Sequence, residues 1–566
     1  MRSRRPWSPL LLVVALAACK REPEAPTAPT VAAPPPPSQT TAPATPEEQR
    51  IADDVRTLAD DRFEGRETGT RGYDLAAEYV AERYAAIGLQ PAGDDGTFFQ
   101  RVPLLKATRE AEGAMLKIAR NGRTIALRFR DQFLTMPNYD AAEHAVEAPA
   151  VFVGQGVHAP ELDHDDFAGL DLKGRIAIVF GGAPARFDND RRAFYSSSRQ
   201  KLATLAERGA VGVVFVNTPK DEADSPWAHD AANWQRAGMR LRGEDGKPVG
   251  TFPQLRGIAA VSAAAADLLF ADGPRTAAQL FDAAEAGTLK GFALPGTLTL
   301  AGRTKLEPVE SRNVVAKLPG SDPALGAEHI VYTAHLDHIG IGAPVKDEHG
   351  VEDRIYNGAL DNALGVAIML EAARQLKAEK AAPKRSLLFV ALTAEEKGLL
   401  GAEWFATRPT VPADSLVANI NMDMPVLLAP SKDVVPIGVE HSTLKGALDA
   451  AAKEMGVVLS PDPFPEEVVF VRSDQYAFIR AGIPAVYLDG GTLSADGERD
   501  PKLALRKFLR DHYHEPSDEA TLPIVWGDAL RLAKLNARIG RLVGDAAERP
   551  RWNDGDFFGG KFAGGR

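Results

Sequence analysis

Histidine and acidic residues follow three apolar runs of this sequence, and each run has the length of a buried strand. The runs and their followers are residues 330–334 with His335 and Asp337, 387–392 with Glu395 and Glu396, and 416–420 with Asp423. In open α/β sheets, ligands bind outside the carboxyl ends of the strands. Three separate segments are therefore expected to bring ionisable side chains to one edge of a sheet.

The spacing of these residues predicts distinct roles. Side chains two residues apart on an extended chain point to the same side, so Asp337 can accept a hydrogen bond from the ring nitrogen of His335 that does not bind metal. Glu395 and Glu396 are adjacent and point differently, so one can bind metal while the other handles a proton of water. Neutral imidazole with carboxylates, and no nearby cysteine, suits zinc, although manganese or cobalt would also fit.

Two further pieces of the predicted site lie on loops. Asp361 precedes a helical pattern, where a carboxylate could also serve only to stabilise the helix N-terminus. The segment 511–518 offers both His512 and His514, and spacing alone does not choose between them. We interpret His338 and His512 as structural residues. As a set, in this order and at strand ends, the acidic and histidine residues point to a metal site.

Five short motifs carry a resemblance to a known family. They are AHLDH (334–338), GALDNA (358–363), TAEE (393–396), NMDM (421–424) and YHEPSD (513–518). The sequence resembles the co-catalytic zinc aminopeptidase family that also contains glutamate carboxypeptidase and the transferrin receptor, over residues of about 46–545. The early stretch FEGRETG (63–69) is similar to members with an inserted protease-associated domain, which suggests an identity for residues 140–300.

The resemblance implies two zinc ions per chain and a role for each matched residue. The implied roles are one zinc at His335 and Asp423, the other at Glu396 and His514, a bridge at Asp361, orientation of His335 by Asp337, and general-base catalysis by Glu395. Two close ions lower the pKa of a shared water, and Glu395 takes its proton and passes it to the leaving amine. Tyr513 matches a position where some relatives use a tyrosine hydroxyl to steady the oxyanion; a packing role is the alternative.

The expected activity is that of an exopeptidase acting on peptide substrates, most simply an aminopeptidase. A carboxypeptidase for acidic peptides and a glutaminyl cyclotransferase are alternatives on the same fold. A catalytically inactive, receptor-like binding protein is a third alternative, and the presence of the complete ligand set with Glu395 argues against it. The net charge of -11 gives no basic footprint for nucleic acid.

The predicted fold is α/β, a mostly parallel mixed sheet flanked by helices, because strand and helix patterns alternate after residue 302. A β-rich region lies before it. The expected organisation is a signal peptide (1–19), a Pro/Ala-rich tether (20–47), the first part of the peptidase domain (48–139), the protease-associated insert (140–300), the main part of the peptidase domain (301–548) and a flexible tail (549–566).

The N-terminal sequence is typical of a lipoprotein export signal. Basic residues precede a short apolar run that cannot span a bilayer, and the sequence Leu-Ala-Ala-Cys ending at Cys19 resembles the bacterial lipobox. Cys19 is the chain's one cysteine, so the sequence predicts lipidation there and a membrane as partner. Lys20 favours the outer membrane of the cell envelope, and the proline-rich segment after it reads as an extended tether.

Overall fold

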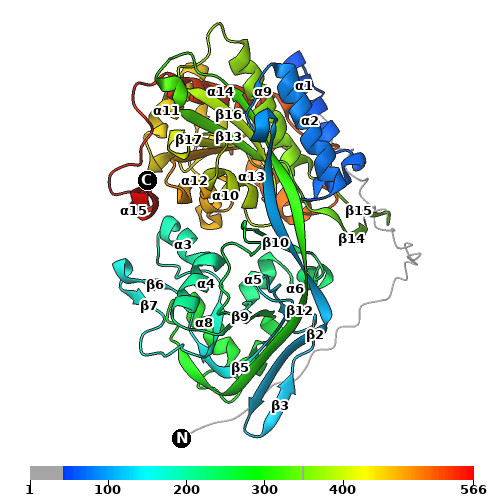
Figure 1. The fold of residues 1–566 in the computed structure, drawn as a ribbon, viewed down its shortest axis with the longest axis vertical. Coiled ribbons are helices and arrows are strands. Elements are labelled where there is room, and N and C mark those ends of the chain that lie inside the picture. The colour runs from blue at the N-terminus through cyan, green and yellow to red at the C-terminus, as the bar shows by residue number, and fades with distance from the viewer. Residues whose placement is uncertain (1–41, 347–349, 566) are drawn as a thin grey trace, which may run out of the picture. The chain divides into compact units, whose positions relative to one another are not determined.

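A computed structural model describes residues 42–346 and 350–565 (Figure 1). The predicted signal peptide, Cys19 and most of the predicted tether lie outside the described residues. Within the described residues, no helix combines the length and the apolar character needed to cross a bilayer.

The centre of the C-terminal half is a mixed sheet with parallel strands in its middle. Its order is β19 (Val458–Leu459), β18 (Asp433–Ile437), β20 (Ala485–Asp489), β17 (Leu416–Asn421), β13 (His329–His335), β16 (Ser386–Leu392) and β12 (Phe292–Leu318). β20, β17, β13 and β16 run parallel. β12 is antiparallel to β16, and β18 is antiparallel to β20 but parallel to β19. Every residue of β13, β16 and β17 is buried, as expected of parallel strands covered on both faces. The predicted fold class is confirmed.

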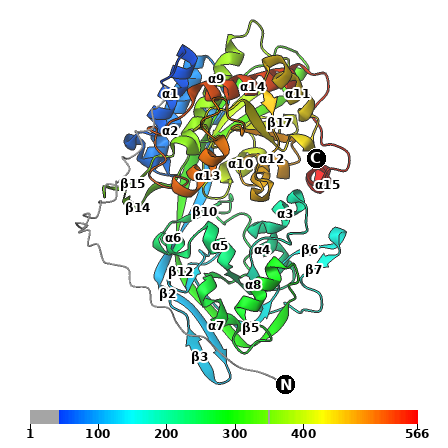
Figure 2. The ribbon, with the colours of Figure 1, turned by 180° about the vertical axis from the view of Figure 1, so that it is seen from behind.

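Helices cover both faces of this sheet. Tyr332 and Phe389 point into a core shared with α1 (Pro46–Leu58), α2 (Arg71–Ile87), α9 (Gly365–Ala378), α11 (Leu444–Met455) and α14 (Trp526–Asp545). Val331 and Leu388, one position away on the same strands, face α10 (Leu400–Thr407) and α12 (Gln475–Arg480). Figure 1 and Figure 2 show α1 and α2 side by side on one flank. α13 (Pro501–Asp511) precedes the segment that carries His514.

α2 begins and ends where it does for clear local reasons. The Thr70 hydroxyl accepts a hydrogen bond from the Tyr73 amide at its start, and Gly88 adopts a left-handed conformation (φ 84°) at its end. A glycine ends helices in this way because it lacks a Cβ.

Two long strands connect this half with the inserted region. β2 (Phe99–Arg120) pairs antiparallel with β12 along most of its length (Figure 1). The strands of the predicted insert are β5 (Glu143–Phe152), β8 (Ile176–Phe180), β9 (Gly212–Val216), β10 (Gly238–Leu241) and β11 (Gly257–Val261). β3 (Arg123–Ala126) and β4 (Phe133–Thr135) precede residue 140 but pair with β2 and β11. Short two-residue strands lie at β1 (Gln90–Pro91), β6 (His158–Ala159) and β7 (His164–Asp165). In the C-terminal half, β14 (Gly340–Lys346) and β15 (Glu352–Tyr356) pair as an antiparallel hairpin. The predicted boundary at 300/301 lies inside β12, and the identity of the insert as a protease-associated domain stays a prediction.

Insert helices pack against these strands. They are α3 (Asn189–Ser196), α4 (Ser198–Glu207), α5 (Pro219–Asp224), α6 (Trp227–Ala232), α7 (Ala266–Phe270) and α8 (Ala277–Glu285). Apolar residues of α4, α7 and α8 contribute to a core around the parallel strands β5, β8, β9 and β11. Phe194 and Tyr195 of α3 pack instead in a cluster that contains Phe558 of the C-terminal segment.

The C-terminal segment differs from the loose tail expected from its glycine content. It forms α15 (Phe557–Phe562), and the Phe558 side chain is completely buried. Trp552 donates its indole N–H to the carbonyl oxygen of Gly482 at 3.0 Å. A few large aromatic side chains anchor the segment, because each buries far more apolar area than the surrounding glycines.

His441 ties this segment to the body by a charged contact that depends on pH. Its Nδ1 lies 2.6 Å from Oδ2 of Asp556, and its Nε2 lies 3.6 Å from Oδ1 of Asp190 in α3. Burial lowers the pKa of His441, but the hydrogen bond to Asp556 and the charge of Asp190 outweigh burial and raise it above its usual value. Glu440 also raises it. The stabilisation is therefore complete below the unfolded pKa of about 6.5 and is lost as pH rises through the folded pKa.

We expect Asp556→Asn to lower the melting temperature by several degrees at pH 6 and by clearly less at pH 9. Asparagine can still cap α15, where Asp556 accepts the Gly559 amide at 2.7 Å, so the variant removes mainly the charge. Calorimetric melting curves across this range measure the effect, with exposed Asp554→Asn as the control. An equal loss at both pH values would contradict the charged contact.

Candidate active site

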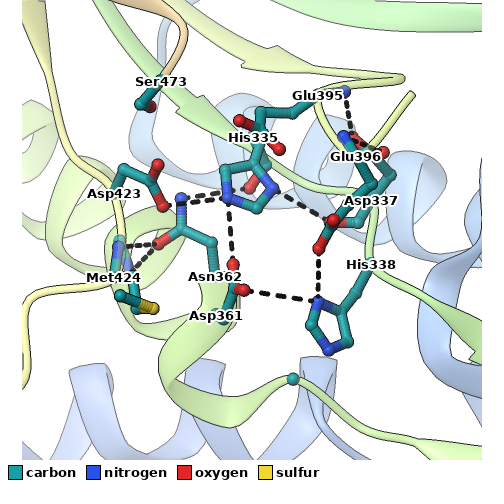
Figure 3. Close-up of polar contacts among 12 residues, drawn as sticks. His335, Asp337, His338, Asp361, Asn362, Glu395, Glu396, Asp423, Met424 and Ser473 are labelled. Atoms are coloured by element: carbon teal, nitrogen blue, oxygen red, sulfur yellow. Dashed lines mark hydrogen bonds and ion pairs between the residues drawn. The ribbon is translucent and has the colours of Figure 1, made fainter. Parts of the chain in front are cut away.

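The predicted ligands converge where three parallel strands end. His335 is the last residue of β13, Glu396 follows β16 by four residues, and Asp423 follows β17 by two residues. Asp361 lies in the turn Ala359–Leu364 just before α9. His514 enters from the connection that follows α13. Figure 3 shows the side chains around a common centre: His335, Asp361, Glu396 and Asp423.

The first of two candidate metal groups contains His335, Asp361 and Asp423, whose ligand atoms lie within 4.8 Å of one another. Nε2 of His335 is 2.9 Å from Oδ1 of Asp423 and 3.2 Å from Oδ1 of Asp361. Burial opposes protonation of His335, but Asp423 and Glu395 outweigh it and raise the pKa of the imidazole well above its usual value. A strongly negative environment surrounds this nitrogen, as a cation site requires.

The second group contains His338, Asp361 and Glu396, with His514 beside it. Nε2 of His514 lies 3.2 Å from Oδ2 of Asp361 and 3.3 Å from Oε1 of Glu396. Asp361 thus turns Oδ1 toward the first group and Oδ2 toward the second. This placement suits the bridging role that the resemblance implied. The structure brings all five predicted ligands together.

Our sequence analysis interpreted His338 as structural, whereas the structure places it among the candidate ligands of the second group. The side chain is completely buried, and its Nδ1 lies 2.9 Å from Oε1 of Glu396 and 3.8 Å from Oδ2 of Asp361. Neither ring nitrogen has a properly aligned hydrogen bond among the described residues. His338 could not be assigned from spacing, because the chain must turn after β13 to direct it toward the second group. Its position three residues after His335 was the available signal.

Asp337 supports the site through different atoms from those predicted. The ring nitrogen Nδ1 of His335 lies 3.0 Å from the main-chain carbonyl oxygen of Asp337 and not against its carboxylate. The carboxylate accepts hydrogen bonds from the amides of Glu395 and Glu396 at 3.0 and 3.3 Å, and from the Thr68 hydroxyl at 3.1 Å. Burial raises the pKa of Asp337 to about 6. One residue therefore orients His335 and also holds the turn that carries both glutamates.

Glu395 lies beside the two groups and belongs to neither of them. Burial raises the pKa of its carboxyl well above the usual value, and the charges of Glu396 and Asp423 add to this effect. A carboxylate near the ligands but outside both donor sets is suited to accept and return a proton.

Tyr513 stacks on His514, with ring centroids 3.9 Å apart. Burial raises the pKa of its phenol, so the hydroxyl keeps its proton. The geometry is that of a packing partner for His514, and the role of Tyr513 at the oxyanion stays a prediction.

Arg66, which the sequence analysis quoted in a motif without a role, bonds to three other segments next to the site. Its buried guanidinium donates to the carbonyl oxygens of Leu58, Leu336, Asn357 and Gly358. Two of these carbonyls flank the segments that carry His335 and Asp361. A buried cation with several carbonyl partners holds such loops in one arrangement.

Two further residues align the turn that carries Asp361. The Asp518 carboxylate accepts the amides of Leu360 and Asp361 at 2.9 and 3.0 Å, so the motif that contains His514 also fixes the bridging residue. Asn362 donates to the carbonyl oxygen of Met422 at 3.0 Å. Asp518 and Asn362 both lie in motifs of the sequence, but only their hydrogen bonds in the folded structure show that they align this turn.

The donor set of the two groups fits zinc. Imidazole nitrogens and carboxylate oxygens are the ligands that zinc takes from proteins in the absence of cysteine. Asp361, Glu396 and Asp423 place negative charges together in a largely buried pocket, where uncompensated charge costs several kcal/mol. Oε1 of Glu396 and both nitrogens of His338 lack aligned hydrogen-bond partners among the described residues. Cations between these atoms would satisfy them.

We expect His338→Ala to weaken the second zinc site by about 10- to 100-fold while the first keeps its affinity. The reason is that His338 faces only the second group. Zinc affinities measured by competition with a chromophoric chelator, together with zinc content per chain, test this. His514→Ala provides the comparison, and His512→Ala is the control because its ring bonds Ser517 instead. Unchanged affinity at both sites would restore the structural interpretation of His338.

Comparisons with known proteins agree with this arrangement. Residues 313–539 match the model of Peptidase family M28, and this stretch contains all five predicted ligands with Asp337, Glu395 and Tyr513. The chain is 45% identical over 67 residues to a probable zinc metalloprotease of Pyrenophora tritici-repentis, which is 12% of this chain and 15% of that protein. It is 34% identical over 121 residues to a vacuolar membrane protease of Yarrowia lipolytica, 21% of this chain and 10% of that one. The matches span a small part of these curated relatives.

Among solved structures, an aminopeptidase from Aneurinibacillus sp. strain AM-1 aligns with 89% of this chain and 98% of its own, at 21% identity and a TM-score of 0.50. The alignment shows that the two proteins share a fold. Residues 313–539 match a peptidase family model, and the donor set within them fits zinc.

Proposed function

We propose that the protein is a zinc-dependent aminopeptidase that releases N-terminal residues from peptides and binds two zinc ions. The observation that carries this proposal is the position of Asp361, whose two oxygens face two separate donor groups with Glu395 beside them. His335, Asp361 and Asp423 would hold one ion. Asp361, Glu396 and His514 would hold the other, with His338 against it.

The chemistry divides between the ions and the side chains. Bound zinc supplies Lewis acidity, which polarises a carbonyl group and lowers the pKa of water toward neutrality. Glu395 takes a proton from the attacking water as the new C–O bond forms, and returns it to the amine nitrogen as the C–N bond breaks. Asp337 keeps Glu395 in place through the hydrogen bond from its amide. The surrounding carboxylates provide a negative environment for a free α-amino group.

Metal content and substrate preference test this function together. The zinc-loaded protein is assayed with aminoacyl anilides, peptides ending in C-terminal glutamate, and peptides with N-terminal glutamine. We expect anilide cleavage and about two zinc ions per chain. Release of C-terminal glutamate or cyclisation of N-terminal glutamine, without anilide cleavage, would replace the aminopeptidase with one of the alternatives on this fold.

We also propose that the protein is exported and lipid-anchored at Cys19 in the cell envelope. The support is the lipobox-like sequence before this residue. Cys19→Ser is expected to move the protein from the membrane fraction to the soluble fraction of cells. A variant that stays in the membrane fraction would reject the anchor.

A further inference from the structure

A cavity of about 450 Å³ lies between the insert and the start of α10, and none of the metal-site residues lines it. Its walls come from residues 136–140, the first residues of α4, the segment 249–255 with β11, and residues 398–403. The volume falls in the range of sites that hold small ligands, about 300–1,000 Å³. The cavity therefore has room for a short segment of peptide.

Most of the lining is apolar. The apolar lining residues include Leu202, Phe215, Phe252, Leu255, Ile258 and Leu400. They come from both the insert and the peptidase half, and an ion pair joins the two sides. Arg199 of α4 contacts the Glu403 carboxylate of α10 through both terminal nitrogens, at 2.8 and 3.1 Å. This pair fixes one wall and leaves neither charge free for a ligand.

Arg240 supplies the available positive charge in this cavity. Its guanidinium lies 4.6 Å over the ring of Tyr139, and Nη1 donates to the neighbouring Met239 carbonyl oxygen at 2.8 Å. In the part of the chain that the structure describes, no carboxylate pairs with Arg240. The other acidic lining residue, Asp140, accepts the hydroxyl of Thr251. A planar guanidinium with most of its donors free matches the geometry of a carboxylate.

The cavity wall is directly connected to the catalytic turn. The Leu400 amide donates to the Ala394 carbonyl oxygen at 3.0 Å, and the Leu399 amide donates to that of Glu395 at 2.9 Å. Gly398 of the cavity wall lies two residues after Glu396, so their Cα atoms are at most about 7.6 Å apart. Met239 and Leu241, on either side of Arg240, pack with Ala394 and Leu400 in one apolar cluster. A ligand in this cavity would thus lie within a short peptide's length of the metal groups.

We propose that this cavity binds the C-terminal end of a peptide substrate, with its apolar side chain against the lining and its carboxylate on Arg240. The inference rests on the proposed aminopeptidase function, since that activity leaves the distant carboxylate of the peptide free. A single unpaired cation in an apolar cavity favours a singly charged carboxylate over a phosphate. The same chemistry, an apolar group beside one carboxylate, also occurs in a free fatty acid.

The test compares leucine p-nitroanilide with peptides of three to six residues that begin and end in leucine, each prepared with a free C-terminal carboxylate and with a C-terminal amide. We expect Arg240→Ala to raise KM for free-acid peptides of one or more lengths by at least about tenfold. This factor corresponds to the free energy that a hydrogen bond to a charged group contributes. The amides and the anilide should be unaffected, because neither presents a carboxylate. Arg240→Lys should keep the positive charge and therefore raise KM less than Arg240→Ala does. Arg256 is exposed, and Arg256→Ala should have the KM of the wild type.

Equal KM values for acid and amide peptides in the wild-type protein would overturn the inference, as would an Arg240→Ala defect of the same size on the anilide. If the wild type cleaves neither anilide nor peptide, the proposed function fails instead. Calorimetric binding of N-acetyl-leucine and of decanoate to the zinc-loaded protein then decides the ligand. Binding of N-acetyl-leucine that depends on Arg240 supports the cavity's role, whereas tighter binding of decanoate assigns the site to fatty acids and rejects the peptide.

Discussion

Glu395→Gln is expected to lower kcat by about 10²- to 10⁴-fold while zinc content stays unchanged. Glutamine keeps the size of the side chain and the backbone amide that donates to Asp337 at 3.0 Å. It loses the ability to accept a proton from water and to return it to the leaving amine. Because Glu395 lies outside both donor groups, its replacement should leave the zinc affinities as they are. Steady-state kinetics on an anilide, with zinc quantified in the same samples, measure both quantities.

Glu498→Gln is the matched control, since this glutamate is exposed on a loop far along the chain from the catalytic turn. It should retain wild-type kcat. Full activity of Glu395→Gln would remove Glu395 from the mechanism and require another base. Loss of zinc in that variant would instead make Glu395 a ligand, which its position beside the groups argues against.

Asp361→Asn is expected to weaken both zinc sites and to reduce activity to that of the metal-free protein. Oδ1 and Oδ2 of Asp361 face different groups, so removal of one charge affects two ions. The turn itself should persist, because Asp518 holds the backbone amides of Leu360 and Asp361 and not the altered carboxylate. Loss of Lewis acidity worth several kcal/mol corresponds to at least about a 10³-fold fall in kcat/KM.

Asp423→Asn and Glu396→Gln serve as comparisons for this variant. Each belongs to one group only, so each should release about one zinc ion more readily than the other. Asp449→Asn, which removes an exposed partner of Lys445, should keep both ions. If Asp361→Asn loses just one ion, Asp361 does not bridge, and the two sites are independent.

Much of the site could be predicted from the sequence, because most of the candidate ligands follow directly after recognisable strands. His335, Glu396 and Asp423 come directly after apolar runs, and parallel strands end at a common edge, so sequence position implies position in space. Local order also accounts for the end of α2, where Gly88 adopts a left-handed conformation. The choice of His514 over His512 depended on the family resemblance. In the structure, His514 lies against Asp361, whereas His512 bonds Ser517.

Tertiary packing decided what spacing left open. The segment that follows β13 brings His338 against Glu396, and no periodic pattern in the sequence predicts that contact. Asp337 was expected to use its carboxylate on His335, but the amides of Glu395 and Glu396 compete for that carboxylate and the main-chain carbonyl contacts the ring instead. The amides that bind the Asp337 carboxylate belong to residues almost sixty positions later in the chain, so local spacing could not predict this arrangement.

The sequence by itself determined the residue types and the strand ends that make a metal site chemically possible. Only the tertiary structure decided that the two oxygens of Asp361 face different groups, and which nearby side chains enclose those groups. It also placed Arg66, far earlier in the chain, against the carbonyls of Leu336 and Gly358. The physical reason is that local patterns depend on neighbours along the chain, whereas a metal centre depends on directions of side chains from segments that meet only after the sheet has formed.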